Sequence, residues 1–108
     1  MKRFPIALAI LAAALWLPTL AAATEHRVTQ KGQQFSPQTL KVRVGDEVVF
    51  LNDDVGTHNV FSESAANKFD LKAQRPGAST RVSFPAPGRI DVRCAIHPAM
   101  RMTIEVVE

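Results

Sequence analysis

The 108-residue sequence contains one cysteine, no tyrosine and only three histidines. A single cysteine, Cys94, cannot form an internal disulfide, so the fold must be held together without cross-links. The motif Cys-x-x-Cys-His, which attaches c-type haem, is absent as well. The 13 basic residues are spread along the chain without interleaved aromatic residues, which argues against nucleic acid as a partner.

The first 23 residues have the features of a secretory signal peptide. Two basic residues precede an apolar run from about residue 4 to residue 20, and three alanines ending at Ala23 supply the small residues that a signal peptidase recognises. The alternative is a membrane anchor, but Pro5 and Pro18 interrupt the run, so cleavage after Ala23 is favoured. Cleavage leaves residues 24–108 as one small periplasmic domain with 11 basic and 10 acidic residues. No later apolar run approaches the length of a membrane span, so we expect no membrane insertion of the mature chain.

After residue 24, hydrophobic residues recur with a period of two, which is typical of strands with one buried face. We expect one strand to end at the turn Gly45-Asp46 and residues 48–51 to return as the next strand. Two further strands are predicted near the C-terminus. The residues expected to point inward are Leu40, Val42, Val44, Ile90, Val92, Cys94, Met102, Ile104 and Val106. Short alternating strands separated by turn signals predict an all-β fold, a Greek-key β-sandwich.

The segment from residue 62 to residue 74 has no clear period. It holds a few apolar residues among polar ones, which is compatible with a turn of helix or with an irregular crossing between strands. The tripeptide Arg75-Pro76-Gly77 is the turn that we expect to return the chain to the sheet.

The stretch from Cys94 to Met100 carries the chemistry. His97 follows Cys94 at an interval of three residues, Met100 follows His97 at the same interval, and His58 lies upstream. A thiolate, two imidazoles and a thioether form a ligand set that is soft on one side and nitrogenous on the other, which suits copper in both oxidation states. Cys94 is also expected on the inward-facing side of its strand, together with Ile90 and Val92, so its sulfur should point into the fold. The sequence therefore predicts one copper site.

Other metal sites and enzyme centres fit the composition less well. Zinc also binds Cys and His, but it gains little from a thioether, and the loop contains no carboxylate. A binuclear copper centre needs a second cysteine, and a multicopper oxidase needs more than three histidines. The sequence therefore favours a protein that is not an enzyme.

The sequence resembles the blue (type 1) copper proteins of the cupredoxin family, in particular the plastocyanin, pseudoazurin and amicyanin group. The resemblance extends from about residue 35 to the C-terminus. It is carried by Phe35-Ser36-Pro37, by residues 40–46, 48–52 and 84–88, by His58-Asn59 and by the loop Cys-x-x-His-x-x-Met. The resemblance implies one type 1 copper ion. Its implied ligands are His58, Cys94 and His97, with Met100 as a weak axial ligand.

Met102 is the alternative axial ligand, because the two methionines are two residues apart and would point to the same side of a strand. Met100 is favoured, since the shorter loop containing Pro98 is stiffer and holds a weak ligand at lower entropic cost. The resemblance also implies that Asn59 ties its strand to the residue after the cysteine, which in related proteins is often Ser or Thr. Here that residue is Ala95, so we expect Asn59 to reach the backbone only.

The function expected from this site is one-electron transfer between periplasmic redox partners. We expect a monomer whose partners dock at His97, and the nearby Arg93 and Arg101 favour a partner with acidic residues. The alternative is a copper-binding protein for periplasmic copper handling or tolerance. The chain has no His-rich or Met-rich tract of the kind that passes copper along, so electron transfer is favoured.

The expected mature N-terminus offers a second set of donors. If cleavage exposes Thr24, then His26 at the third position can complete a square-planar Cu(II) site with the amine and two backbone amides. The alternative is an ordinary histidine at the start of the first strand. It is favoured, because strand pairing would use the same amides.

Overall fold

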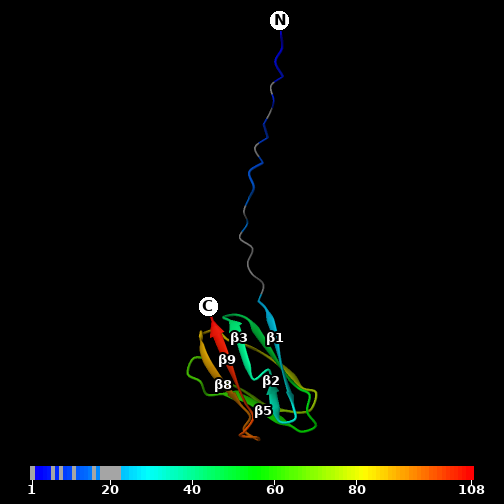
Figure 1. Ribbon diagram of the computed structural model, residues 1–108, viewed down its shortest axis with the longest axis vertical. Helices are drawn as coiled ribbons and strands as arrows, with labels where there is room; N and C mark the ends of the chain where they lie inside the picture. The colour runs from blue at the N-terminus through cyan, green and yellow to red at the C-terminus, as the bar shows by residue number, and fades with distance from the viewer. Residues whose placement is uncertain (1, 6, 8, 11, 16, 18–22) are drawn as a thin grey trace.

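The computed structural model describes residues 2–5, 7, 9–10, 12–15, 17 and 23–108. The described residues before Thr24 have no regular secondary structure and lie outside the folded domain (Figure 1). Within this described part of the chain, no helix has the length and apolar character that crossing a membrane requires. The expected signal peptide, residues 1–23, falls partly outside the described residues, and its cleavage after Ala23 stays a prediction.

Two sheets form the folded domain. Its strands, within the described ranges, are β1 (Glu25–Lys31), β2 (Gln34–Ser36), β3 (Thr39–Arg43), β4 (Glu47–Asn52), β5 (His58–Ser62), β6 (Phe69–Gln74), β7 (Ser79–Ser83), β8 (Gly88–Arg93) and β9 (Arg101–Val107). One sheet has the order β2-β1-β4-β7 and the other the order β3-β9-β8-β5-β6. The chain changes sheet after β2, β3, β4, β6 and β7, as the connections of a Greek-key sandwich do. The predicted all-β sandwich is confirmed.

Alternation along β8 and β9 places the core and, with it, the cysteine. Ile90 and Val92 of β8 are fully buried, and Cys94, just past the strand, is 1% exposed. The inward residues of β9 are Met102, Ile104 and Val106, all buried. The two strands pair in antiparallel register from Gly88 opposite Val106 to Arg93 opposite Arg101. The inward faces predicted for both strands are therefore confirmed, and Cys94 leaves the ladder pointing into the core.

The region of β3 and β4 differs from expectation in two ways. Val42 is buried as predicted, but Val44 is 39% exposed, because β3 ends at Arg43 and Val44 lies in the turn. Residues 47–52 do form the next strand, yet it does not pair with β3. β3 pairs with β9, whereas β4 pairs with β1 and β7, so the turn carries the chain from one sheet to the other. A period of two indicates the buried face of a strand, but it does not identify the neighbouring strand.

The segment without a clear period contains no helical turn. It is irregular over residues 63–68 and forms a strand over residues 69–74. A turn closed by the hydrogen bond from Asn67 N–H to the Ser64 carbonyl (3.1 Å) leads into β6, which pairs with β5. The register of this pair shifts between Asn59 and Phe61, and Lys72 has a φ of 59°. Such a bulge interrupts the alternation, which is why the strand is not evident from the sequence.

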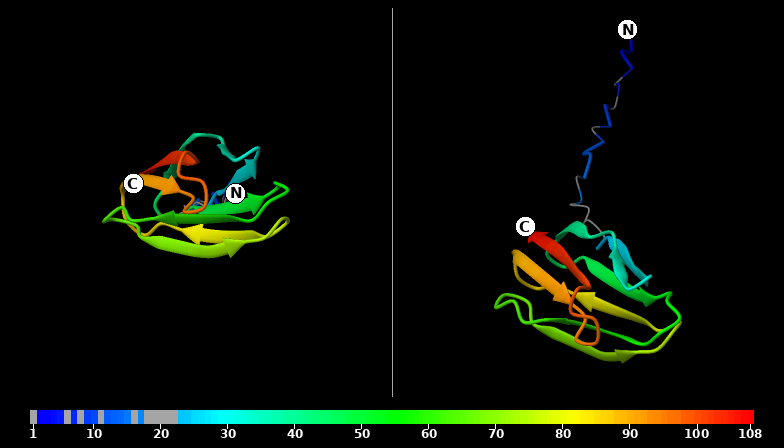
Figure 2. Two further views of the ribbon diagram at one scale, coloured as in Figure 1. Left: turned by 90° about the horizontal axis from the view of Figure 1, so that it is seen from below. Right: turned by 60° about the horizontal axis from the view of Figure 1, so that its bottom comes forward.

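The two ends of the sandwich are occupied by different groups. The loop between β8 and β9 lies at one end, and the C-terminus and the start of β1 lie at the other (Figures 1 and 2). At the latter end, β1 pairs with β4 from Glu25 onwards, and His26 Nε2 lies 2.9 Å from Asp46 Oδ2. His26 is thus an early residue of the first strand, and a square-planar copper site there would compete with this pairing.

Asp46 ties the start of β1 to the turn before β4. Its carboxylate accepts hydrogen bonds from Arg43 N–H (2.9 Å) and Thr24 N–H (3.1 Å), in addition to its contact with His26. These bonds, the one from Arg43 first, lower the pKa of Asp46 from 3.8 to about 2. A carboxylate whose pKa is lowered by folding stabilises the folded state above its unfolded pKa. That contribution is lost as the pH falls through the folded pKa.

Replacing Asp46 by Asn should therefore make the free energy of unfolding depend less steeply on pH in the acid range. The variant should be less stable than wild type above the ordinary pKa of 3.8, and the two should converge as the pH falls to about 2. Urea unfolding of the metal-free protein across this range measures the effect, with the exposed Asp53→Asn as the control. A difference that stays constant from neutral pH to the acid limit would contradict this role.

Candidate metal centre

Three of the predicted ligands converge at the end of the sandwich that holds the β8–β9 loop. His58 begins β5, Cys94 follows the last residue of β8, and His97 lies in the loop leading to β9. Cys94 Sγ lies 3.9 Å from Nδ1 of each histidine, and the two Nδ1 atoms are 3.1 Å apart. The sheet order, in which β5 lies beside β8, brings together residues that are 36 positions apart in sequence.

The three side chains differ in their exposure. His58 and Cys94 are each 1% exposed, whereas His97 is half-buried. Its neighbours in the loop are apolar, and Ile96 is 52% exposed. The site is therefore closed toward the core and reaches solvent through His97.

Backbone hydrogen bonds close the loop from Cys94 to Met100. Met100 N–H donates to the His97 carbonyl (2.9 Å), and Cys94 N–H donates to the Met100 carbonyl (3.3 Å). Both candidate methionines are buried, Met100 at 1% and Met102 at 3% exposure. Met102, however, belongs to β9 and lies opposite Val92 in the ladder. Met100 is thus the methionine whose backbone is bonded directly to the other loop residues of the site.

A carboxylate fixes the His58 ring. His58 Nε2 lies 2.8 Å from Asp54 Oδ2, and because an ionised carboxylate only accepts hydrogen bonds, Nε2 carries the proton. The neutral ring then has its lone pair on Nδ1, the atom that faces Cys94 and His97. Backbone N–H groups of Gln33 and Val55 also donate to Asp54, each at 2.9 Å. The bond from Gln33, followed by those from His58 and Val55, holds the pKa of Asp54 well below its usual range.

Asn59 connects three parts of the site. Its Oδ1 accepts a hydrogen bond from Ala95 N–H (3.2 Å), and its backbone N–H donates to Cys94 Sγ (3.3 Å). Its Nδ2 donates to Asp70 Oδ1 (2.9 Å) and to the Lys72 carbonyl (3.1 Å). The backbone link from Asn59 to the residue after the cysteine is present, as expected. The bond to Asp70 is additional.

The donor atoms suit a single first-row metal ion. Metals of this kind bind imidazole nitrogen and thiolate sulfur at ~2.0–2.3 Å, so donors 3.1–3.9 Å apart can share one ion. All three atoms lie within 4.8 Å of one another. A thiolate combined with two imidazoles favours copper, with zinc as the chemical competitor.

The sequence pattern does not reveal the two carboxylates that support the site. Asp54 precedes His58 by four residues in the loop 53–57, and this proximity to a candidate ligand is the signal that could have found it. Asp70 lies in the bulged strand β6, and nothing in the sequence pairs it with Asn59. The Asp54–His58 contact is local, whereas the bond between Asn59 and Asp70 depends on the pairing of β5 with β6.

Comparison with known proteins gives matches over most of the chain. The model of a family described as copper binding proteins, plastocyanin/azurin family, matches residues 22–107. The chain is 33% identical over 87 residues to the methylamine utilization protein MauL of Methylorubrum extorquens, a match that covers 80% of this chain and 76% of MauL.

Solved structures give the same fold. The Cu-containing nitrite reductase NirK from Thermus scotoductus SA-01 superposes with a TM-score of 0.73 at 28% identity, covering 78% of this chain but 22% of NirK. A reduced amicyanin variant superposes with a TM-score of 0.67 at 26% identity, covering 81% of this chain and 84% of amicyanin. The chain thus spans most of amicyanin and about a fifth of the nitrite reductase.

Replacing Asp54 by Ala should weaken copper binding about 10–100-fold, the usual effect of removing a group that orients a ligand histidine. The His58 ring would lose the acceptor that keeps its proton on Nε2. Competition with a chromogenic Cu(I) chelator measures the affinity. Asp53→Ala, at the neighbouring exposed position, serves as the control. Equal affinity of Asp54→Ala and wild type would show that the contact is not needed.

Proposed function

The chain belongs to the blue copper proteins of the plastocyanin/azurin family, the cupredoxins, and from this premise we propose that it is a periplasmic one-electron carrier and not an enzyme. The ligands in this proposal are His58, Cys94, His97 and Met100. The observation that carries it is the convergence of two imidazole nitrogens and one thiol sulfur within 4.8 Å. Copper bound there supplies a one-electron couple.

The chain holds its donors in place through the surrounding strands. Cys94 is fixed by the β8–β9 ladder and by the hydrogen bond from Asn59 N–H to its sulfur, and His58 is fixed by Asp54. Donors that are held in this way need to move little when the oxidation state changes. A small rearrangement favours fast electron transfer.

Met100 is the better candidate for the fourth ligand. Its backbone is bonded to both Cys94 and His97, so its position is coupled to theirs. Met102 is placed by the β9 ladder and packs in the core with Ile90 and Val92. We assign Met100 as the weak ligand and Met102 as part of the core that closes beneath the site.

The surface around His97 suits a small redox interface. Ile96, Pro98 and Ala99 are exposed beside it, and Val55, in the loop that leads into His58, is 98% exposed. Apolar residues of this kind let a partner approach the half-buried histidine without displacing tightly bound water. We propose that redox partners dock there and that the protein works as a monomer.

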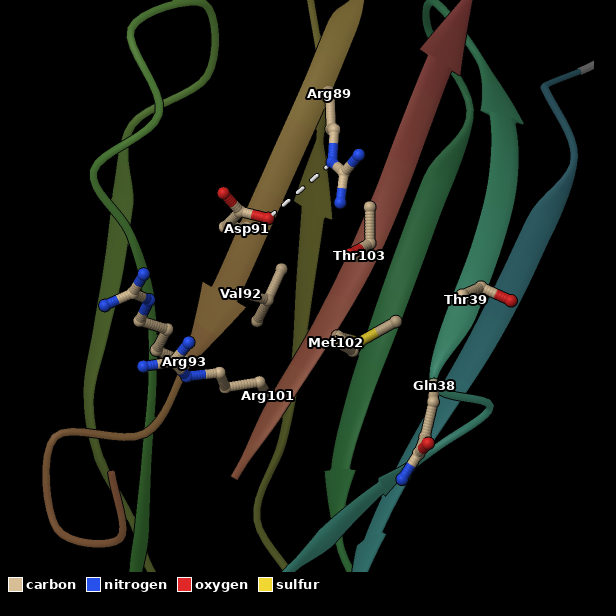
Figure 3. A pocket seen from close by; sticks show the side chains of 9 residues that line it. All are labelled: Gln38, Thr39, Arg89, Asp91, Val92, Arg93, Arg101, Met102 and Thr103. Carbon is tan, nitrogen blue, oxygen red and sulfur yellow. Dashed lines mark ion pairs between the residues drawn. The ribbon is translucent and has the colours of Figure 1, made fainter. Parts of the chain in front are cut away.

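Two arginines beside this surface favour a partner whose docking surface is negatively charged. Arg93 and Arg101 lie directly opposite each other at the ends of β8 and β9, next to the loop (Figure 3). Arg89, further along β8, has Asp91 at 3.9 Å. Like charges directly opposite each other weaken a sheet, so an acidic partner surface would relieve the repulsion between Arg93 and Arg101.

Copper handling is the less favoured function. Two of the three convergent donors are 1% exposed, so another protein could reach only His97 without opening the fold. A site that releases copper to partners benefits from accessible donors, whereas a carrier benefits from buried ones. Loss of copper tolerance with intact respiration in a deletion strain would favour handling instead.

The central test uses the mature chain, residues 24–108, loaded with Cu(II). A strong visible thiolate charge-transfer band and a reversible one-electron wave in voltammetry are expected. Replacing Met100 by Leu should shift the band and raise the potential, because a weak ligand to Cu(II) is lost, whereas Met102→Leu should change neither. A colourless protein would contradict the copper assignment. The reverse pattern for the two methionine variants would assign the ligand to Met102.

Exchanging Arg93 and Arg101 for Gln should slow reduction by the anionic hexacyanoferrate(II) and speed reduction by the cationic hexaammineruthenium(II). Both effects follow from the lost positive charge near His97 and should shrink as ionic strength rises. Stopped-flow absorbance of the copper band measures the rates. Arg43→Gln, at the far end of β3, is the matched control. Equal effects of all three substitutions would show that the charge near the loop has no special role.

A further inference from the structure

The side chain of Asn59 is held from two sides. On one side its Oδ1 accepts the Ala95 N–H, the first amide after the cysteine (3.2 Å). On the other side its Nδ2 donates to Asp70 and to the Lys72 carbonyl, both on β6. Ala95 has no polar side-chain group, so the side chain at position 95 cannot take up the Asn59 amide. The orientation of Asn59 therefore depends on its contacts with β6.

Asp70 is the charged member of these contacts. Its Oδ1 accepts Asn59 Nδ2 at 2.9 Å and Lys72 N–H at 2.8 Å, and its side chain is 48% exposed. The Lys72 N–H reaches this oxygen at the bulge of β6, where Lys72 has a φ of 59°. One carboxylate oxygen thus fixes both the bulge and the Asn59 amide. A hydrogen bond to an ionised acceptor is about twice as strong as a neutral one.

The orientation of the Asn59 amide matters to the sulfur. With Nδ2 turned to β6, Oδ1 must face Ala95, and this bond fixes the chain directly after Cys94. The backbone N–H of the same Asn59 donates to Cys94 Sγ. A rotated amide would present N–H groups to the Ala95 N–H and would release this part of the loop.

We propose that Asp70 is a positioning residue for the copper site, acting through Asn59 to fix the chain around Cys94. This role rests on the proposed ligand set. Asp70 touches neither the donor atoms nor the docking surface around His97, so its substitution tests the support of the site separately from the site itself.

Replacing Asp70 by Ala should speed copper loss to a chelator by up to about tenfold, the lower end of the range for groups behind a ligand, and should shift the thiolate band. Asp70→Asn keeps an acceptor oxygen and should stay within about twofold of wild type. Lys72→Gln removes only the exposed ion pair at 3.6 Å and should have no effect. In an Asn59→Ala background, Asp70→Ala should add little further loss, because its route to the sulfur is already broken.

Amide hydrogen exchange of the metal-free protein provides a readout that does not need copper. Asp70→Ala should raise exchange at Ala95, whereas Asp70→Asn should not. Failure of wild type to show a thiolate band would overturn the proposed function, and exchange at Ala95 would still test Asp70. Unchanged exchange and copper loss in Asp70→Ala would overturn the role of Asp70. Equal changes in the Ala and Asn variants would assign the effect to the charge of Asp70, and an undiminished effect without Asn59 would assign it to another route, such as the bulge of β6. Either result would overturn the proposal.

Discussion

Two imidazole nitrogens and a thiol sulfur lie within 4.8 Å of one another, and this convergence requires the ends of two strands that are distant in sequence to meet. The sheet order β9-β8-β5 satisfies this requirement. Cys94 arrives from β8 with the inward parity of Ile90 and Val92, and His58 starts β5 at the same end. The loop that returns to β9 then has only to bring His97 alongside.

The polar groups around the site make this arrangement specific. Asp54 sets the proton on the outer nitrogen of His58, and Asn59 links the sulfur, the loop backbone and β6. Neither contact adds a donor to the metal. Each restricts the orientation of a residue in the proposed ligand set, and donors held in this way would let one rigid site serve two oxidation states. Of the three converging side chains, His97 is the one that is partly exposed, so access to the site is directed to one face of the folded domain.

Much of this could be predicted from the sequence, because it depends on local pattern. The period of two places Ile90, Val92 and Cys94 on one face, and the spacing of Cys94, His97 and Met100 predicts a loop around one ion. What could not be predicted depends on which strands pair and in which register. The separation of β3 from β4 into different sheets and the hydrogen bond that Asn59 donates to Asp70 leave no periodic signal. The strand β6 is not evident from the sequence for a related reason. The bulge at Lys72 interrupts the alternation of buried and exposed residues by which a strand is recognised.

We propose that the fold holds the same donors around copper in both oxidation states. X-ray absorption spectroscopy of the copper-loaded protein, oxidised and then reduced in the same sample, tests it most directly. We expect one sulfur and two nitrogen ligands at short range in both states, with nearly unchanged bond lengths. Loss of a histidine on reduction, or added oxygen ligands on oxidation, would contradict it.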